Sequence, residues 1–245
     1  MIPFYFITLF PKELSQYLLK GLILKAVKSS KIGLHFIDLR SFSKDKFHVD
    51  DTPFSEKKGM LLKADVLYDA ITSIDQFDSF RLLCPSPEGV LFNQDLVKSW
   101  LPQTKGYVFI MGYYEGIDER LFDALPIQKI SLGDMVLSSG ELPSLVMADA
   151  IIRLIPGVMG NEACIADDSF ENHLLEYPQY TRPKKFQSWS VPDLLTSGHH
   201  KHIQEWRTLK KLEQTCFKRP DLFAKACLTD DEKKIFKTLM EEFVS

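Results

Sequence analysis

The sequence lacks the patterns that mark several large classes of protein. No apolar run approaches the roughly 18 residues that a membrane-spanning helix needs. The apolar N-terminus carries no basic leader and is interrupted by Pro11, so we interpret it as a strand and not as a signal peptide. The four cysteines show no CxxC spacing, which argues against zinc and disulfide frameworks and favours a cytoplasmic location.

Nucleotide-binding fingerprints and a strong overall charge are missing as well. No segment has the GxGxxG or P-loop spacing, and the formal net charge is only −3. The charge is uneven, however. Residues 173–220 hold nine Lys or Arg against four Asp or Glu, which gives +5, together with four of the six histidines. This segment is either the solvated face of a helix or a nucleic-acid-binding surface.

Short, nearly continuous apolar runs alternate with helical patterns over residues 1–160. Such runs are typical of strands covered on both faces of a parallel sheet, which predicts an α/β domain with right-handed crossovers. The expected strands are 2–10, 32–42, 80–86, 106–114 and 128–134. The expected helices are 11–29 (with Pro11 in its first turn), 64–75, 93–102 (with Asn93 as N-cap), 117–125 and 141–155.

The pattern changes after Pro156-Gly157. We expect a linker over 161–172 and a small, mostly helical, basic domain over 173–245. Helical periodicity dominates from about residue 199, with a break at Arg219-Pro220. The stretch TDDE, which begins at Thr229, has the spacing of a capping box.

Three segments fall where expected strands end, namely 84–89, 111–116 and 131–143. All three carry glycine with Ser, Pro or Glu. Ligands of open α/β sheets bind beyond the carboxyl ends of the strands, so these segments form a candidate pocket. The alternative is a set of tight turns, with Ser138 or Ser139 serving as an ordinary helix N-cap.

Candidate catalytic side chains lie around the expected linker. Asp168 either caps a short helix or acts as a base on a segment that closes over a substrate. Arg153 either pairs with a buried acid or stabilises negative charge on a substrate oxygen. The histidines of GHHKH (198–202) have no cysteine or acid at ligand spacing, so we assign no metal site.

Taken in order, the motifs resemble those of the bacterial tRNA (guanine-N1)-methyltransferases, the TrmD family of the SPOUT superfamily. The resemblance covers nearly the whole chain and is carried by SPEG, GYYEGIDER, LGDMVLSSGELP, RLIPGVMGNEA, DDSF, YPQYTRP, VPDLL, GHH and KRPDL. It implies an α/β domain, a parallel sheet with helices on both faces, that ends in a C-terminal trefoil knot. It also implies a basic C-terminal domain and a homodimer.

The resemblance also assigns roles to residues. The knot loops would bind S-adenosylmethionine through Ser86, Pro87, Gly112, Tyr114, Glu115, Gly116, Leu132, Gly133, Leu137 and Gly140. Asp168 matches the general base that frees N1 of guanosine 37, directly 3′ of the anticodon, and Arg153 matches the residue that stabilises charge on its O6. The basic tail would bind the anticodon branch of tRNA. The family is also associated with Mg2+, for which the sequence offers no ligand motif.

Several residues depart from the family pattern. Ser55, Glu56, Lys57 and Lys58 stand where glycines and proline are usual, and Tyr113, Met135 and Ser139 replace typical pocket residues. Two alternatives therefore remain beside an active enzyme. One is a tRNA-binding homologue with weakened catalysis, and the other is a SPOUT methyltransferase that acts on ribosomal RNA.

Overall fold

The computed structural model describes residues 1–45, 48–54, 59–101, 103–160 and 168–244. The chain divides into two compact units, Met1–Gly160 and Asn161–Ser245. In the described part of the chain, no helix combines the length and the apolar character needed to cross a membrane.

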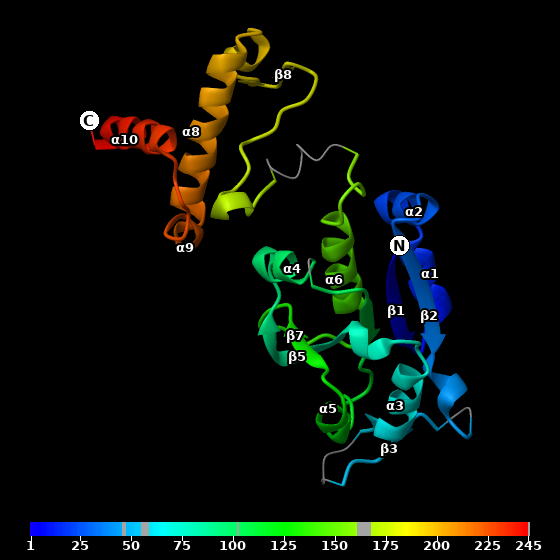
Figure 1. The fold of residues 1–245 in the computed structure, drawn as a ribbon. Helices are drawn as coiled ribbons and strands as arrows, with labels where there is room; N and C mark the ends of the chain where they lie inside the picture. The colour runs from blue at the N-terminus through cyan, green and yellow to red at the C-terminus, as the bar shows by residue number, and fades with distance from the viewer. Residues whose placement is uncertain (46–47, 55–58, 102, 161–167, 245) are drawn as a thin grey trace. The chain divides into compact units, whose positions relative to one another are not determined.

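The N-terminal unit is built on a five-stranded sheet in which every pairing is parallel (Figure 1). The strand order is β2-β1-β6-β5-β7, with β1 Ile2–Thr8, β2 Ile32–Asp38, β5 Arg81–Leu91, β6 Tyr107–Ile110 and β7 Gln128–Ser131. All five correspond to strands expected from the apolar runs. The predicted α/β class with a central parallel sheet is therefore confirmed.

Helices cover both faces of the sheet. Strand β1 contributes to both buried clusters, because successive side chains of a strand point to opposite faces. Phe4 and Phe6 of β1 belong to one buried cluster, and Ile7 belongs to the other. The first cluster packs under α1 (Pro11–Leu18), α2 (Gly21–Lys28), α4 (Gln94–Trp100) and α6 (Glu141–Arg153). The second packs under α3 (Ala64–Thr72) and α5 (Arg120–Ala124). The rings of Phe4, Phe6 and Phe109 stack in the first cluster, with centroids 5.1 and 6.4 Å apart.

The helix expected over 11–29 is in fact two helices, so that prediction was wrong in its continuity. Lys20 is extended (φ −135°, ψ 160°) and Gly21 has φ +49°, a conformation that glycine adopts at little cost. Pro11 does begin α1, and the Asn93 side chain does cap α4 by accepting a hydrogen bond from the Leu96 amide at 2.9 Å. Smaller elements are η1 Leu39–Phe42, β3 Asp50–Asp51, β4 Leu61–Leu62 and η2 Phe77–Ser79.

The C-terminal unit is mostly helical. Its elements are η3 Glu171–His173, a hairpin of β8 (Lys185–Phe186) and β9 (Trp189–Ser190), η4 Asp193–Thr196, α8 His200–Lys218, α9 Pro220–Phe223 and α10 Asp230–Val244. The capping box before α10 is confirmed, because Glu232 accepts from the Thr229 amide at 2.8 Å and Thr229 Oγ1 accepts from the Glu232 amide at 3.3 Å. The described part of the expected linker folds against this unit, since Asn172 and Cys227 exchange two hydrogen bonds.

Candidate active site

A cavity of about 420 Å3 lies in the N-terminal unit, beside the bulge of β5 and beyond the ends of β6 and β7. Its walls come from the three segments that the sequence placed at strand ends, together with the first turn of α6. The volume falls within the roughly 300–1,000 Å3 of small-molecule sites. In an open α/β sheet this edge is the usual place for a ligand.

All the residues matched to the cofactor site line this one cavity. They are Ser86 and Pro87 from the β5 segment, Gly112, Tyr114, Glu115 and Gly116 after β6, and Leu132, Gly133, Leu137 and Gly140 after β7. Three sequence segments, which together span Ser86 to Gly140, thus meet because their strands are neighbours in the sheet.

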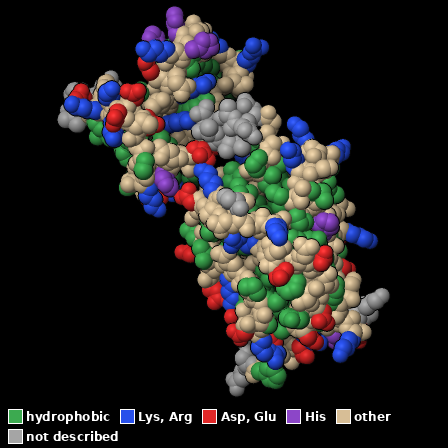
Figure 2. Space-filling view, in the orientation of Figure 1, with side chains coloured by type: hydrophobic (Ala, Val, Ile, Leu, Met, Phe, Trp, Pro, Cys, Tyr) green, Lys and Arg blue, Asp and Glu red, His purple; other side chains and the backbone are tan. Residues whose placement is uncertain are grey.

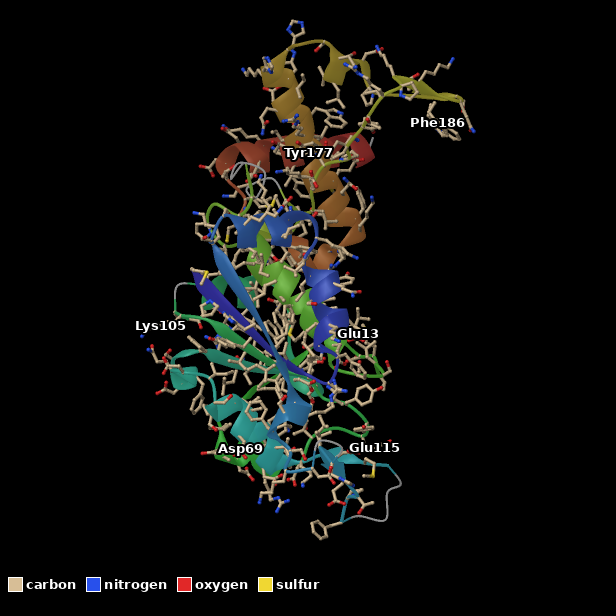
Figure 3. All side chains as sticks on the ribbon, turned by 90° about the vertical axis from the view of Figure 1, so that its right-hand side faces the viewer. Glu13, Asp69, Lys105, Glu115, Tyr177 and Phe186 are labelled. Atoms are coloured by element: carbon tan, nitrogen blue, oxygen red, sulfur yellow. The ribbon has the colours of Figure 1, made fainter. Side chains whose placement is uncertain are left out.

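The turn after β6 is held in an unusual conformation. Tyr114 has φ +56°, which is uncommon outside glycine, and Gly116 has φ +126°. Main-chain hydrogen bonds fix this turn to the segment before α3, from Glu115 N to Met60 O and from Leu62 N to Gly116 O, both 3.0 Å. Glu115 is labelled in Figure 3. A Cβ on Gly59 would lie 2.3 Å from Glu115 Cγ, so the observed packing of the Glu115 side chain requires glycine at position 59.

A close main-chain contact joins the segments after β6 and β7. Gly140 N donates to Gly112 O at 2.7 Å, and a Cβ on Gly140 would lie 2.7 Å from Gly112 N. This contact also corrects the alternative interpretation of Ser138 and Ser139. The N-cap of α6 is Gly140, with no side-chain hydrogen bond, because only a residue without Cβ fits against Gly112.

β5 leaves its parallel pairing with β7 after Pro85 and resumes it at Val90, with a bulge between the two residues. Both Pro85 and Val90 pair with Ile130, so the residues between them project as a loop. Lys129 stabilises this loop through two ion pairs. Its Nζ lies 2.6 Å from Glu88 Oε1 and 2.7 Å from Glu119 Oε1, and 4.1 Å from the centre of the Phe122 ring. Partial burial acts to lower the pKa of Lys129, but its hydrogen bonds to Glu119 and Glu88 outweigh this and raise the pKa.

We expect Lys129→Met to loosen the loop that carries Ser86 and Pro87. The side chain of Lys129 is 19% exposed and both glutamates are largely exposed, so screening limits the stability loss to about 1 kcal/mol. The affinity for S-adenosylmethionine should fall a few-fold, measured by calorimetry. Lys233→Met, which removes an exposed ion pair with Asp230 in the C-terminal unit, is the matched control. Equal affinity in both variants would remove the bracing role.

Sequence reasoning did not assign some of the cavity lining. Ser131, Val136 and Pro143 also line it. Ser131 is the last residue of β7, and its Oγ accepts from Gly133 N at 3.1 Å, which shapes the following turn. Its place at the carboxyl end of a strand is the signal that could have identified it. Tyr113 and Met135, two of the departures from the family pattern, also line the cavity. Residues 55–58, the other main departure, lie outside the described residues.

Two ionisable side chains in or near the cavity, Tyr114 and Cys84, are uncharged at neutral pH. Burial raises the pKa of Tyr114, with smaller contributions from Asp50 and Tyr113, so its hydroxyl stays protonated at neutral pH. Burial raises the pKa of the nearby Cys84 thiol to about 12, which keeps it protonated as well. Neither side chain is therefore an activated nucleophile.

The two candidate catalytic residues belong to different units. Arg153 is the last residue of α6, whereas the cavity meets the first turn of that helix. At about 1.5 Å per residue, Arg153 lies about 20 Å along the helix from Gly140. Asp168 belongs to the C-terminal unit. It precedes a tight turn in which Ser169 Oγ accepts from the Glu176 amide at 3.0 Å and Phe170 has φ +75°.

Many basic side chains of the C-terminal unit already have partners within it. Lys184 pairs with Asp193, Lys210 with Glu213 and Arg219 with Asp221, and Arg207 covers the ring of Tyr177. The sum of +5 already subtracts Asp193 and Glu213, whereas Asp221 lies outside residues 173–220 and offsets one further cation. Among the described residues, no group of three or more His, Cys, Asp or Glu side chains could hold a metal ion.

Comparison with known proteins agrees with this geometry. The family model described as tRNA (Guanine-1)-methyltransferase TrmD matches residues 2–225. Two relatives are named tRNA (guanine-N(1)-)-methyltransferase, from Staphylococcus epidermidis and Brevibacillus brevis. The first is 42% identical over 95% of both chains, and the second is 42% identical over 96% of this chain and 97% of its own. A Staphylococcus carnosus relative of the same name is 41% identical over 97% of both chains. The resemblance inferred from the motifs is confirmed, and this chain belongs to the tRNA (guanine-N1)-methyltransferase family.

Proposed function

We propose that this protein transfers the methyl group of S-adenosylmethionine to N1 of the guanosine directly 3′ of the anticodon in tRNA, guanosine 37. The observation that carries the proposal is that all the residues matched to the cofactor site line one cavity at the carboxyl edge of a parallel sheet. Membership of the family supplies the reaction and the tRNA substrate. Because the substrate is tRNA, we propose that the protein acts in the cytoplasm.

The cavity is suited to the cofactor. Its lining combines main chain exposed at glycines, the hydroxyls of Ser86 and Tyr114, and apolar side chains such as Leu132. Around Gly112, a Cβ would meet only the Ile117 side chain, at 3.8 Å or more, which leaves room for a ligand against the main chain. When bound there, S-adenosylmethionine supplies an electrophilic methyl group. The described residues do not fit Mg2+ in the same way, so no step is assigned to it.

Gly112→Ala is expected to separate cofactor binding from folding. The new methyl group makes only ordinary contacts within the chain, so the melting temperature should stay within about 2 °C of the wild type. The same methyl group narrows the cavity, so the Kd for S-adenosylmethionine should rise at least tenfold, measured by calorimetry. Gly160→Ala, whose Cβ meets only Lys25 Nζ at 3.8 Å, is the matched control. Wild-type affinity in Gly112→Ala would contradict the assignment of this wall.

The protein groups have distinct tasks in the proposed reaction. N1 of guanine carries a proton at neutral pH, so its lone pair must be freed before it can accept a methyl group. The carboxylate of Asp168 takes that proton as general base. The guanidinium of Arg153 stabilises the negative charge that develops on O6 as the proton leaves. The target base must leave its stack to reach them.

We propose that the protein acts as a homodimer, because one chain cannot complete the site. From Pro143 at the cavity, Arg153 lies about 15 Å along α6, so the Arg153 and the Asp168 that serve a given cavity come from a second copy. An exposed apolar surface supports this pairing. Leu142 and Val146 lie one turn apart on α6 with 53% and 47% of their surface exposed, and Val136 beside the cavity is 91% exposed.

We further propose that the segments after β6 and β7 form the trefoil knot of the family. The main-chain contact between Gly140 and Gly112 supports a tight passage of one segment against the other. The return of Val90 to Ile130 beyond the bulge supports a closed loop within β5. The C-terminal unit is then the tRNA-binding domain.

A methyl-transfer assay tests the function. Radiolabelled S-adenosylmethionine is incubated with transcripts of one tRNA that carry guanosine or adenosine at the position 3′ of the anticodon. We expect label in the guanosine transcript alone, with 1-methylguanosine after nuclease digestion. Salt-sensitive binding of both transcripts without label would favour a non-catalytic homologue. Label in ribosomal RNA but in neither transcript would favour the other SPOUT activity.

A further inference from the structure

The C-terminal unit contains a cavity of its own, of about 830 Å3. It lies between the extended segment 177–184 and the first half of α8, so it does not depend on the N-terminal unit. Its lining includes Tyr177, Tyr180, Arg182, Lys184, His200, Trp206 and Arg207. The reaction proposed above does not use this cavity.

The charge of this lining has one sign. Arg182, Lys184 and Arg207 are cationic, and the described lining includes no Asp or Glu. Asp193 pairs with Lys184 at 2.9 Å from outside, and its side chain is 93% exposed, so it offsets one cation at most. Within the described residues, Arg207 Nε is buried and has no hydrogen-bond partner. A buried donor of this kind favours an anionic or acceptor-bearing ligand.

Aromatic rings form the second part of the lining. The rings of Tyr180 and Trp206 lie 6.3 Å apart with an interplanar angle of 49°. Tyr180 is 48% exposed, so part of its surface is open to a ligand. Tyr177 is buried beneath the guanidinium of Arg207, 4.8 Å from its ring centre, which holds that cation in place. Figure 3 labels Tyr177 and, well apart from it on the hairpin, Phe186.

The N-terminus of α8 adds main-chain donors at the rim. Its N-cap residue His199 provides no side-chain cap, and the first turn holds no acidic residue. His200, the first residue of the helix, lines the cavity. Histidine and basic side chains gather over this end of the unit (Figure 2). The free amides and the helix dipole at such an end favour a phosphate group.

We propose that this cavity binds one unstacked nucleotide of the tRNA anticodon branch, with its base against Tyr180 and Trp206. Its 5′-phosphate lies near Arg182, His200 and the first amides of α8. Cations that follow the backbone and aromatic rings that stack on splayed bases are the usual features of single-stranded RNA sites. The inference rests on the proposed function, because it assigns to this cavity a part of the same substrate.

Filter binding of tRNA to the full-length protein tests the proposal without requiring methyl transfer. Tyr180→Ala should raise the Kd for tRNA roughly tenfold to a hundredfold, because one stacking surface is lost. Tyr180→Phe keeps the ring and should bind like the wild type. Tyr68→Ala, at a tyrosine of α3 that is 42% exposed, is the matched control in the N-terminal unit. Calorimetry should show the same affinity of all four proteins for S-adenosylmethionine.

A set of anticodon stem-loops, each with one abasic loop nucleotide, identifies the bound base. At one position, removal of the base should weaken binding to the wild type as much as Tyr180→Ala weakens binding of the intact stem-loop. Tyr180→Ala should then bind that abasic RNA with no further loss of affinity. Guanosine 5′-monophosphate alone tests whether a free nucleotide binds as RNA does. Wild-type affinity of Tyr180→Ala for tRNA would overturn the proposal. Additive losses at every position would overturn it as well. If the wild type methylates tRNA in either case, the proposed function stands and only this inference fails.

Discussion

Asp168→Ala is expected to lower the rate of methyl transfer by about 10²–10⁴-fold, the range that a general base contributes. The affinity for S-adenosylmethionine should not change, because the described lining of the cavity belongs to the N-terminal unit. Single-turnover kinetics with saturating tRNA measure the rate, and calorimetry measures the affinity. Asp230→Ala, at a largely exposed acid of the C-terminal unit, is the control. Near-normal turnover in Asp168→Ala would remove this residue from the base role.

Mixed dimers extend this test to the assembly. Gly112→Ala weakens cofactor binding and Asp168→Ala removes the base, so each variant alone should have little activity at a cofactor concentration below the wild-type Kd. If every site combines the cavity of one chain with the base of the other, a mixed dimer regains one complete site and measurable turnover. If each chain uses its own aspartate, the mixed dimer has no complete site and stays inactive. That outcome would contradict the proposed arrangement.

Gly140→Ala is expected to damage both folding and cofactor binding. The added Cβ would lie 2.7 Å from Gly112 N and 3.0 Å from Met111 Cα, and neither main-chain atom can move without shifting a strand end. Overpacking of this kind costs about 1–3 kcal/mol. The melting temperature of a domain of this size should therefore fall by several degrees. The Kd for S-adenosylmethionine should rise well above tenfold, because the segments after β6 and β7 separate.

Thermal unfolding and calorimetry measure the two effects of Gly140→Ala. Gly112→Ala is the informative comparison, because it places a methyl group on the opposite side of the same contact without a main-chain clash. Loss of binding in both variants, with loss of stability in Gly140→Ala alone, is the expected pattern. A Gly140→Ala protein with the melting temperature and affinity of the wild type would show that the close contact is not required.

The local elements followed from local signals in the sequence. The apolar runs predicted every strand of the sheet, Asn93 and the Thr229–Glu232 capping box predicted two helix starts, and Pro11 predicted a third. These features depend on side chains within a few residues of each other, which is why composition and spacing were sufficient. The exception at Lys20 and Gly21 shows the limit. A single left-handed glycine divides a segment whose helical periodicity continues through it.

The sequence by itself determined the alternation of strands and helices, the ordered motifs that identify the family, and the residues around the candidate cofactor site. Only the tertiary structure decided how those residues work together. Gly140 is needed because Gly112 lies against it, Gly59 because Glu115 passes over it, and Lys129 because two glutamates converge on it. The second cavity, beside Tyr180 and Trp206, also required the tertiary structure. The physical reason is the same in each case, since such contacts join segments far apart in the chain and leave no periodic pattern in the sequence.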